Sequence, residues 1–467
     1  MNPFRIPLAL LVAVVLAGCA SVEPGSALRD VQALTQTHTG HAVSADRSAD
    51  ELARTARQVD ELLRQPLAMD AAVQIALLNN RGLQARLQQL GITEAEVAQA
   101  ARLPNPGLRF GRIKKGDEIE LERGLHFNLA RLLTLPLVSR LEERRLQALQ
   151  RELAMDVLRL AADTRKAWVQ AVAAGESLRY MRQVQDAAEA SAELARRMQQ
   201  AGNFNALMRL REQGFYADAA LGLTRAEQVH RAARERLSRL LGLWGEQLAF
   251  QLPERLPDLP AAPKDQPDIE RQAIAQRLDV QAARLAAEQT ARNLELTRVT
   301  RFVSVFELGL VRNTSNEGPR QTGWEVDLEL PLFDWGSART AKAQGIYMQA
   351  VHQAAAVAIN ARSEVREAYG NYRASYDIAR HHRDEIVPLK KRISEEQLLR
   401  YNGMLIGVFE LLADARSQIA SVKASIDALR DFWLAQVDLD QALIGRASLP
   451  APTDPVTAAT EAGGAGH

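Results

Sequence analysis

Residues 118–129 read EIELERGLHFNL, and the alternation within this stretch decides the fold class. Its odd positions are apolar except for Arg123, and its even positions are mostly polar. A period of two is typical of a β-strand with one apolar and one polar face. The length is close to the roughly 9–11 residues that a tilted transmembrane strand needs. Residues 107–113 are predicted to form its partner strand, joined through a turn at 114–117.

A second strand pair follows later in the chain. Over residues 323–330, Trp324, Val326, Leu328 and Leu330 alternate with Glu325, Asp327 and Glu329. The predicted partner strand is 302–311, and residues 312–322 form the loop between them. Four strands cannot close a barrel alone, and open sheet edges are not tolerated in lipid. The chain must therefore oligomerise if these strands enter a membrane.

Acidic side chains share one face of the predicted strands. If the apolar residues face lipid, six carboxylates face the lumen: Glu118, Glu120, Glu122, Glu325, Asp327 and Glu329. Repeated around an oligomer, each carboxylate becomes a ring that favours cations over anions. The alternative is an interior that is simply polar, as barrel interiors usually are. The sequence leaves both interpretations open.

The two strand pairs belong to an internal duplication. Short matches recur in the same order, shifted by 195 to 203 residues: Leu83-Gln84-Ala85 with Val280-Gln281-Ala282, Leu135-Pro136-Leu137 with Leu330-Pro331-Leu332, Gly202 with Gly403, and Leu241-Gly242 with Ile444-Gly445. Two structural repeats are therefore predicted, 70–248 and 269–447. The Pro- and Asp-rich residues 249–268 are predicted to link them. The Ala-, Gly- and Thr-rich tail 448–467 is expected to be disordered.

Each repeat also contains long helices. No proline lies between Leu137 and Leu252, so this stretch can hold a helix of about 60 residues, roughly 90 Å long. Heptad spacing predicts a coiled-coil seam at Tyr180, Val184, Ala187, Ser191, Leu194 and Met198. Glycine turns at 201–203 and 401–403 fold each repeat into a helical hairpin, and Pro388 predicts a kink. The helices alone also fit an ordinary bundle, so the strands carry the membrane interpretation.

The N-terminus carries a targeting signal. A short apolar run, Ile6 to Leu16, ends in Leu16-Ala17-Gly18-Cys19. A run this short is typical of a secretory signal peptide, here residues 1–18. Its end resembles a lipobox, which implies cleavage before Cys19, acylation of that thiol and a lipid-anchored N-terminal segment, 19–69. The next residue is alanine, which by resemblance to bacterial lipoproteins implies sorting to the outer membrane.

No catalytic or metal-binding constellation is visible in the sequence. Adjacent residues on a helix lie about 100° apart, so His381 and His382 cannot both face one site. His38 and His41 have no cysteine or carboxylate beside them. The net charge of +1 gives no basic excess for nucleic acid. We therefore expect no enzyme activity, no cofactor, no metal site and no nucleic-acid partner.

Duplicated halves, a strand pair between helices, a glycine-broken hairpin in each half and a lipobox together resemble the TolC-like outer-membrane factors, lipoprotein type. The most specific match is Leu330-Pro331-Leu332-Phe333-Asp334-Trp335-Gly336, similar to the family's strand-to-helix junction. The resemblance implies a mostly α fold with a small transmembrane β part. It implies a homotrimer whose twelve-stranded β-barrel continues as a periplasmic α-helical barrel.

The resemblance also implies a function and its sites. The protein would be the outer-membrane duct of a tripartite efflux system, opened by an inner-membrane pump and a periplasmic adaptor, for metal cations or small toxic compounds. The predicted adaptor-docking residues at the hairpin tips are Gly202, Asn203, Phe204, Gly403, Met404, Leu405 and Gly407. Asn203, Phe204, Met404 and Leu405 are expected to be exposed. The nearest candidates for an acidic constriction of the closed entrance are Glu410 and Asp414.

A different class of protein also has long helical hairpins. A structural or adaptor-type coiled-coil envelope lipoprotein would bridge layers of the envelope without forming a pore. Such an adaptor normally has one helical hairpin flanked by β-rich segments. This chain has two predicted hairpins, each accompanied by alternating strands, which favours the duct.

Overall fold

The computed structural model describes residues 25–446 apart from 47, 104, 301–305, 317 and 329–334. The predicted signal peptide, Cys19, Glu329, most of the 330–336 junction and the tail 448–467 lie outside the described residues. The chain forms two compact units. The first comprises Met1–Arg47, Arg81–Val157 and Leu278–Ala358, and the second comprises Ser48–Asn80, Leu158–Arg277 and Ile359–His467. Each unit therefore draws on both predicted repeats.

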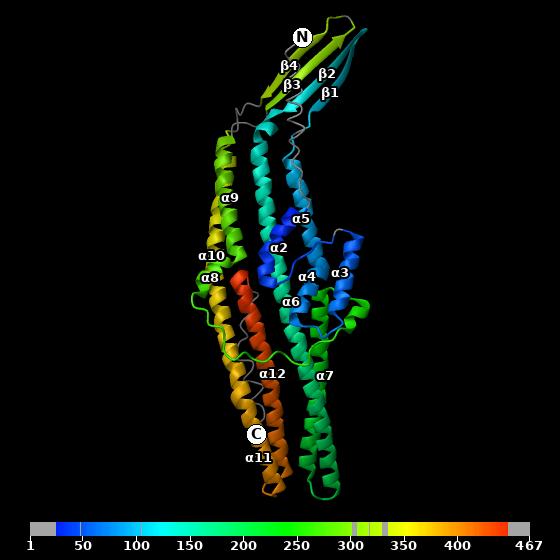
Figure 1. Cartoon of the computed structure of the whole chain (residues 1–467), viewed down its shortest axis with the longest axis vertical. Coiled ribbons are helices and arrows are strands. Elements are labelled where there is room, and N and C mark those ends of the chain that lie inside the picture. The colour runs from blue at the N-terminus through cyan, green and yellow to red at the C-terminus, as the bar shows by residue number, and fades with distance from the viewer. Residues whose placement is uncertain are drawn as a thin grey trace. The chain divides into compact units, whose positions relative to one another are not determined.

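The first unit contains a four-stranded antiparallel sheet with the order β1-β2-β3-β4 (Figure 1). Its strands are β1 (Gly107–Lys115), β2 (Glu118–Asn128), β3 (Phe306–Ser315) and β4 (Gln321–Leu328). One hairpin from each repeat contributes, and the two meet along the β2–β3 ladder. In the described chain β1 and β4 are edge strands, so each presents a row of backbone groups without a partner strand.

The loop predicted for residues 312–322 is wrong at both ends. β3 continues to Ser315 and β4 already begins at Gln321. Arg312 pairs with Arg123, and Ser315 pairs with Glu120, across the β2–β3 ladder. The residues at the end of β3 are polar on both faces. They belong to the strand because they pair with β2 and β4, and they show no apolar alternation from which the sequence could predict it.

The register separates the sheet into an apolar and a polar face. One row of paired residues consists of Leu125, Leu310 and Trp324. The next row consists of His126, Gly309 and Glu325. Since side chains alternate along a strand, the acids of β2 and β4 share the face of His126. The apolar face is bare in the single chain, where Leu108 is 85% and Trp324 is 74% exposed.

The helices of the first unit begin close to the N-terminus. They are α2 (Ser26–Thr39), α5 (Arg81–Ala100), α9 (Leu278–Thr300) and the first parts of α6 (Leu129–Gln200) and α10 (Ser337–His381). The buried carboxylate of Glu94 in α5 accepts hydrogen bonds from the backbone N–H of Gly25 (3.3 Å) and Ala27 (2.7 Å). It thereby satisfies donors that a helix N-terminus leaves unpaired. The start of α2 is thus fixed to α5.

The first long helix exceeds its prediction. α6 has 72 residues and contains Pro136, whereas the sequence reading places the helix after that proline. Proline removes one backbone donor, and α6 nevertheless continues through Pro136. Among the described helices, none combines the length and apolar character that a bilayer span requires.

The second unit holds the remaining helices and the later parts of α6 and α10. They are α3 (Ala49–Leu62), α4 (Met69–Asn79), α7 (Ala206–Leu241), η1 (Gly245–Ala249), α8 (Ile269–Gln276), η2 (His382–Ile386), α11 (Val387–Asn402) and α12 (Val408–Ile444). Two antiparallel hairpins result, α6 with α7 and α11 with α12 (Figure 1). η2 is a π-helical turn that ends two residues before Pro388. It is the predicted irregularity, since a proline cannot continue the regular hydrogen bonding.

The seam of the first hairpin is shifted from the predicted one. Val184 is buried as expected, but Ala188 and Ala195 are buried where the heptad spacing selects Ala187 and Leu194, which are exposed. At about 100° per residue, Ala188 and Ala195 lie about 40° and 20° from Val184 around the helix, whereas Ala187 and Leu194 lie about 60° and 80° away. The buried stripe therefore follows the 3.6-residue period of the helix and not the 3.5-residue heptad.

Each repeat has a joint between two helices. α4 gives way to α5 at Asn80, and α8 gives way to α9 at Arg277, both in extended conformation. The Asn80 amide donates to the carbonyl oxygen of Leu240 (2.9 Å), and the Arg277 guanidinium donates to that of Ala442 (3.3 Å). These carbonyls end α7 and α12, where a helix leaves acceptors unpaired. Each joint therefore caps the returning helix of its own repeat.

The predicted linker lies against helices of the second unit. The Trp433 indole donates to the carbonyl oxygen of Pro257 (2.9 Å). The Tyr376 hydroxyl lies 2.9 Å from the carbonyl oxygen of Ala261, and the Tyr372 hydroxyl accepts from the backbone N–H of Lys264 (2.9 Å). Residues 249–268 are thus held in place by side chains of α10 and α12.

Gly242 is the position where the repeat joint tolerates no side chain. Its φ is 67°, and an added Cβ would lie 2.6 Å from the carbonyl oxygen of Asn79. We predict that Gly242→Ala destabilises the protein by about 2–4 kcal/mol, through left-handed strain and the broken cap. Gly370→Ala is the control, because Gly370 lies in α10 with open space around it; it should gain up to about 1 kcal/mol. Thermal unfolding followed by circular dichroism measures both, and equal midpoints would contradict the prediction.

Candidate functional site at the hairpin tips and the sheet

The tip of the first hairpin is a glycine-terminated helix end. Gly202 has a φ of 80°. Its N–H donates to the carbonyl oxygen of Gln199 (3.0 Å), and the N–H of Asn203 donates to that of Met198 (2.9 Å). This pair of bonds is a Schellman motif. Asn205 then caps α7, because its side-chain oxygen accepts from the N–H of Met208 (2.8 Å).

The second tip has the same backbone with a different residue at its key position. Met404, with a φ of 59°, is left-handed, whereas Gly403 has a φ of −81°. The N–H of Met404 donates to the carbonyl oxygen of Tyr401 (3.0 Å), and that of Leu405 donates to Arg400 (2.9 Å). Gly202 therefore corresponds to Met404, and the predicted match of Gly202 with Gly403 is wrong. Aligning glycine with glycine places the turn one residue too early.

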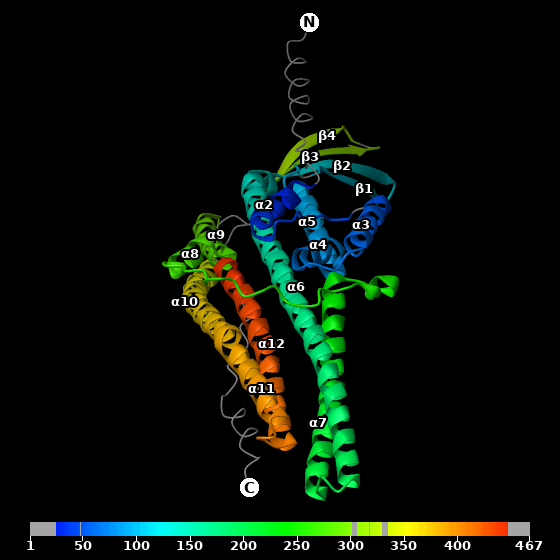
Figure 2. The ribbon, with the colours of Figure 1, turned by 60° about the horizontal axis from the view of Figure 1, so that its bottom comes forward.

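Most of the predicted tip residues are exposed, with one exception. Gly202, Asn203, Gly403, Met404, Leu405 and Gly407 are exposed, Met404 at 93% and Leu405 at 78%. Phe204 is only 8% exposed, so its predicted exposure is wrong. It lines a cavity of about 610 Å³ between the two tips, together with Met198, Met208, Tyr401 and Ile406. Figure 2 shows the two hairpin ends side by side. The ring of Phe204 packs in this cavity, whereas Asn203 and Asn205 on either side of it are exposed.

A buried ion pair joins the two hairpins behind their tips. Glu212 of α7 has no exposed surface, and its Oε1 lies 2.6 Å from Nη2 of Arg416 in α12. Its other oxygen accepts from the hydroxyl of Ser191 (2.8 Å), and the guanidinium of Arg416 lies 4.4 Å from the ring centroid of Phe215. A buried carboxylate needs such a full set of partners. The sequence gives no signal for this contact, which joins residues in different repeats.

A second ion pair links the hairpins further along α6. Lys166 contacts Asp438 of α12, and both side chains are nearly buried. Burial raises the pKa of Asp438 above its usual range, although the lysine opposes the shift. Asp440, two residues on, also has a pKa raised by burial. Charged contacts therefore hold α12 against α6 and α7 at two levels.

The two entrance candidates occupy the start of α12. Glu410 lies in its first turn and is exposed. Asp414 follows one turn later on the same side of the helix. It is half-buried, and its Oδ2 has no hydrogen-bond partner among the described residues. Both residues therefore lie within the first two turns of α12, directly after the second tip.

The polar face of the sheet gathers the predicted acids. Glu118 accepts from the hydroxyl of Ser315 (2.9 Å), and Glu325 Oε1 lies 3.2 Å from Nδ1 of His126. Glu325 also covers Gly309, where an added Cβ would lie 2.6 Å from its Cγ. Glu120 and Glu122 share this face by alternation on β2, and Asp327 shares it on β4. Within the described residues no group of three or more His, Cys, Asp or Glu could hold a metal ion.

This architecture has relatives by structure although not by sequence. Neither a protein-family model nor a curated protein matches the chain by sequence. By structure, the chain has the fold of outer-membrane channel proteins, which confirms the expected fold class.

Three solved structures illustrate the likeness. The CusC channel has a TM-score of 0.68 at 18% identity, covering 82% of this chain and 93% of that one. The outer-membrane channel OprN has a TM-score of 0.68 at 17% identity, covering 88% and 95%. The outer-membrane protein VceC of Vibrio cholerae has a TM-score of 0.65 at 14% identity, covering 86% and 98%.

The Glu212–Arg416 pair yields a test of how the hairpins are held together. Arg416→Ala leaves a fully buried carboxylate unpaired and should cost about 3 kcal/mol or more. The double variant Glu212→Leu with Arg416→Met removes both charges and should regain most of that stability. Arg197→Ala is the control, because its ion pair with Glu193 lies on the exposed surface. The midpoint of thermal unfolding distinguishes these outcomes. A double variant as unstable as Arg416→Ala would show that the pair does not act as a unit.

Proposed function

We propose that this chain is one protomer of a homotrimeric outer-membrane channel, the passive duct of a tripartite export system. The observation that carries the proposal is the sheet, whose one face is apolar and bare while its other face collects carboxylates. A contiguous apolar face that is exposed marks a contact with lipid or protein. A strand with apolar and polar residues in alternation suits a wall between lipid and water.

Closure of the sheet supports three copies. In the described chain β1 and β4 are its two edges. Open edges cannot remain in lipid, so the β4 edge of one copy would pair with the β1 edge of the next. Three copies would then give the twelve strands that the resemblance implies. Rotational symmetry makes such head-to-tail contacts close into a ring.

The helices offer a matching surface for the neighbouring copies. α7 exposes small and apolar residues at heptad spacing, Leu207, Leu210, Gly214, Ala217 and Leu221. The opposite side of α7, where Glu212 and Ala219 are buried, is the side that packs within the chain. A second seam on one helix is what a continuous helical wall requires, because each helix must contact a neighbour on either side.

The hairpin tips are the proposed adaptor-docking site. Met404 and Leu405 place large apolar side chains in solvent beside exposed Asn203. Apolar residues mixed with polar ones are typical of docking surfaces, and methionine adapts readily to a partner. An inner-membrane pump would supply the energy, so the chain itself needs no catalytic residues. Glu410 and Asp414, at the start of α12, remain the proposed acidic constriction.

The anchor and the cargo complete the proposal. Acylation of Cys19 would tether the trimer to the outer membrane, with the helices in the periplasm. The acids of the polar sheet face would line the lumen and favour cations, and the alternation of the sequence adds Glu329 to this proposal. Cargo of metal cations or small toxic compounds is consistent with such a lining. A pore-free coiled-coil lipoprotein accounts for neither the apolar sheet face nor its open edges.

Docking at the tips can be tested without disturbing the fold. Gly403→Glu and Gly407→Glu add charge where the backbone has ordinary φ values. We expect both to abolish export in cells that carry the cognate pump and adaptor, because a charge would be desolvated on docking. The heat-modifiable trimer band in outer-membrane fractions should persist. Gly370→Glu on α10 is the control and should export normally. Loss of the trimer would instead assign the tips a folding role, and normal export would refute docking there.

The lumen acids can be tested by conductance. Glu325→Ser and Asp327→Ser, combined with Glu329→Ser, should reduce cation selectivity, seen as a shifted reversal potential in planar bilayers under a salt gradient. Removing one carboxylate from each copy removes a ring of charge. Glu246→Ser, an exposed acid in η1, is the control. An unchanged reversal potential would mean that the acids serve only as a polar lining. Absence of any conductance would contradict the channel itself.

A further inference from the structure

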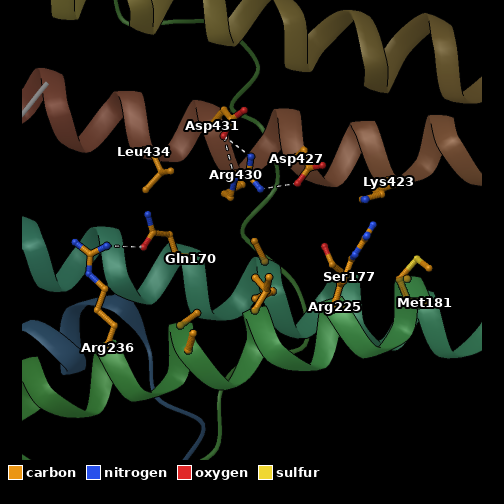
Figure 3. A pocket seen from close by; sticks show the side chains of 17 residues that line it. Gln170, Ser177, Met181, Arg225, Arg236, Lys423, Asp427, Arg430, Asp431 and Leu434 are labelled. Carbon is orange, nitrogen blue, oxygen red and sulfur yellow. Dashed lines mark hydrogen bonds and ion pairs between the residues drawn. The ribbon is translucent and has the colours of Figure 1, made fainter. Parts of the chain in front are cut away.

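A groove in the second unit lies outside the tips and the sheet. It runs between α6, α7 and α12 and has a volume of about 820 Å³ (Figure 3). Its floor is small and apolar, formed by Ala173 and Ala174 of α6, Ala226 and Val229 of α7, and Leu434 of α12. Sites for small organic molecules have volumes of roughly 300–1,000 Å³ and mostly apolar walls. The groove therefore has the size and floor of a small-molecule site.

The charges around the groove are unbalanced. Its two acids, Asp427 and Asp431, both contact Arg430, at 2.5 Å and 2.8 Å. These three groups together carry one net negative charge. Three further cations line the groove: Arg236 has a hydrogen-bond partner in the lining, whereas Arg225 and Lys423 have no ion pair or hydrogen bond in the part of the chain that the structure describes. With four cations against two acids, the lining has a net positive charge.

The two unpaired cations converge. Figure 3 shows Arg225 reaching from α7 and Lys423 from α12 into the same end of the groove, beside Ser177 of α6. Like charges that approach one another repel, and a bound anion would turn that repulsion into two attractions. A hydroxyl beside them adds a hydrogen-bond donor for the same anion. Leu434 lies toward the opposite end, next to the apolar floor.

We infer that this groove binds an organic anion with an apolar body. The carboxylate or sulfonate of the ligand lies between Arg225, Lys423 and the Ser177 hydroxyl, and its body covers the alanine floor toward Leu434. Both parts are needed, because exposed cations alone hold an anion weakly at physiological ionic strength. The site belongs to a single chain, so it does not rest on pore formation.

The experiment uses the purified full-length protein in a nonionic detergent and 8-anilinonaphthalene-1-sulfonate as the probe. Isothermal titration, with the detergent alone subtracted, should give saturable binding of one probe per chain. The double variant Arg225→Gln with Lys423→Gln should weaken binding at least tenfold. Ala226→Phe keeps the charges but fills the floor, and it should also abolish saturable binding. The control is Arg231→Gln with Lys391→Gln, exposed cations of α7 and α11 outside the groove, which should bind as the natural protein does.

A second ligand distinguishes an anion-binding site from a groove that binds apolar molecules regardless of their charge. N-phenyl-1-naphthylamine has the same apolar body without the sulfonate, and it should bind at least tenfold more weakly. Added salt should weaken binding of the sulfonate and leave binding of the amine unaffected, because only the sulfonate binds through its charge. Equal binding of the two ligands, undiminished binding by the double variant, or no saturable binding of the sulfonate would each overturn the inference. Circular dichroism of each variant confirms that its helices are intact.

Discussion

Backbone hydrogen bonding at the edges of the sheet is the constraint on which the rest of the molecule depends. β1 and β4 each present unpaired groups in the described chain, and they border a face with Leu108 and Trp324 bare. Water tolerates the edges but not the face, and lipid tolerates the face but not the edges. In the proposed channel, lateral pairing with further copies would satisfy both. The helices would then form a wall shared among chains, which is consistent with an α7 that has one buried and one exposed seam.

The two repeats solve the same structural problems with different side chains. At the helix joints, an asparagine amide in one repeat and an arginine guanidinium in the other cap the returning helix. At the tips, a glycine and a methionine adopt the same left-handed backbone. A non-glycine residue in this conformation costs about 1 kcal/mol or more. The backbone of the duplicated unit is therefore retained while its chemistry diverges, and the second tip holds strain that the first does not.

Local periodicity made the fold class predictable from the sequence, and its limits explain the errors. Alternation located β2 closely and β4 to within two residues at its start, because one face of each strand is apolar. It missed the end of β3, where residues such as Arg312 and Ser315 are polar on both faces. Spacing located the hairpins but misplaced the seam by a residue at Ala188 and the second turn at Met404, because helical drift and backbone φ leave little trace in residue type. Phe204 is buried by a contact between tips, and Glu212 meets Arg416 across the repeats. Such long-range contacts have no local pattern at all.

The bare apolar face also determines how the chain must be made. If the chain is secreted and assembles as proposed, each protomer would carry an apolar sheet with two open edges through water before it meets its neighbours, and exposed apolar strand edges are prone to edge-to-edge aggregation. A net charge of +1 over the full sequence provides little long-range repulsion to delay it. Assembly of the proposed trimer would slow steeply when chains are scarce, whereas aggregation would accelerate when they are abundant. Biogenesis of such a channel would therefore succeed only within a limited range of chain concentration.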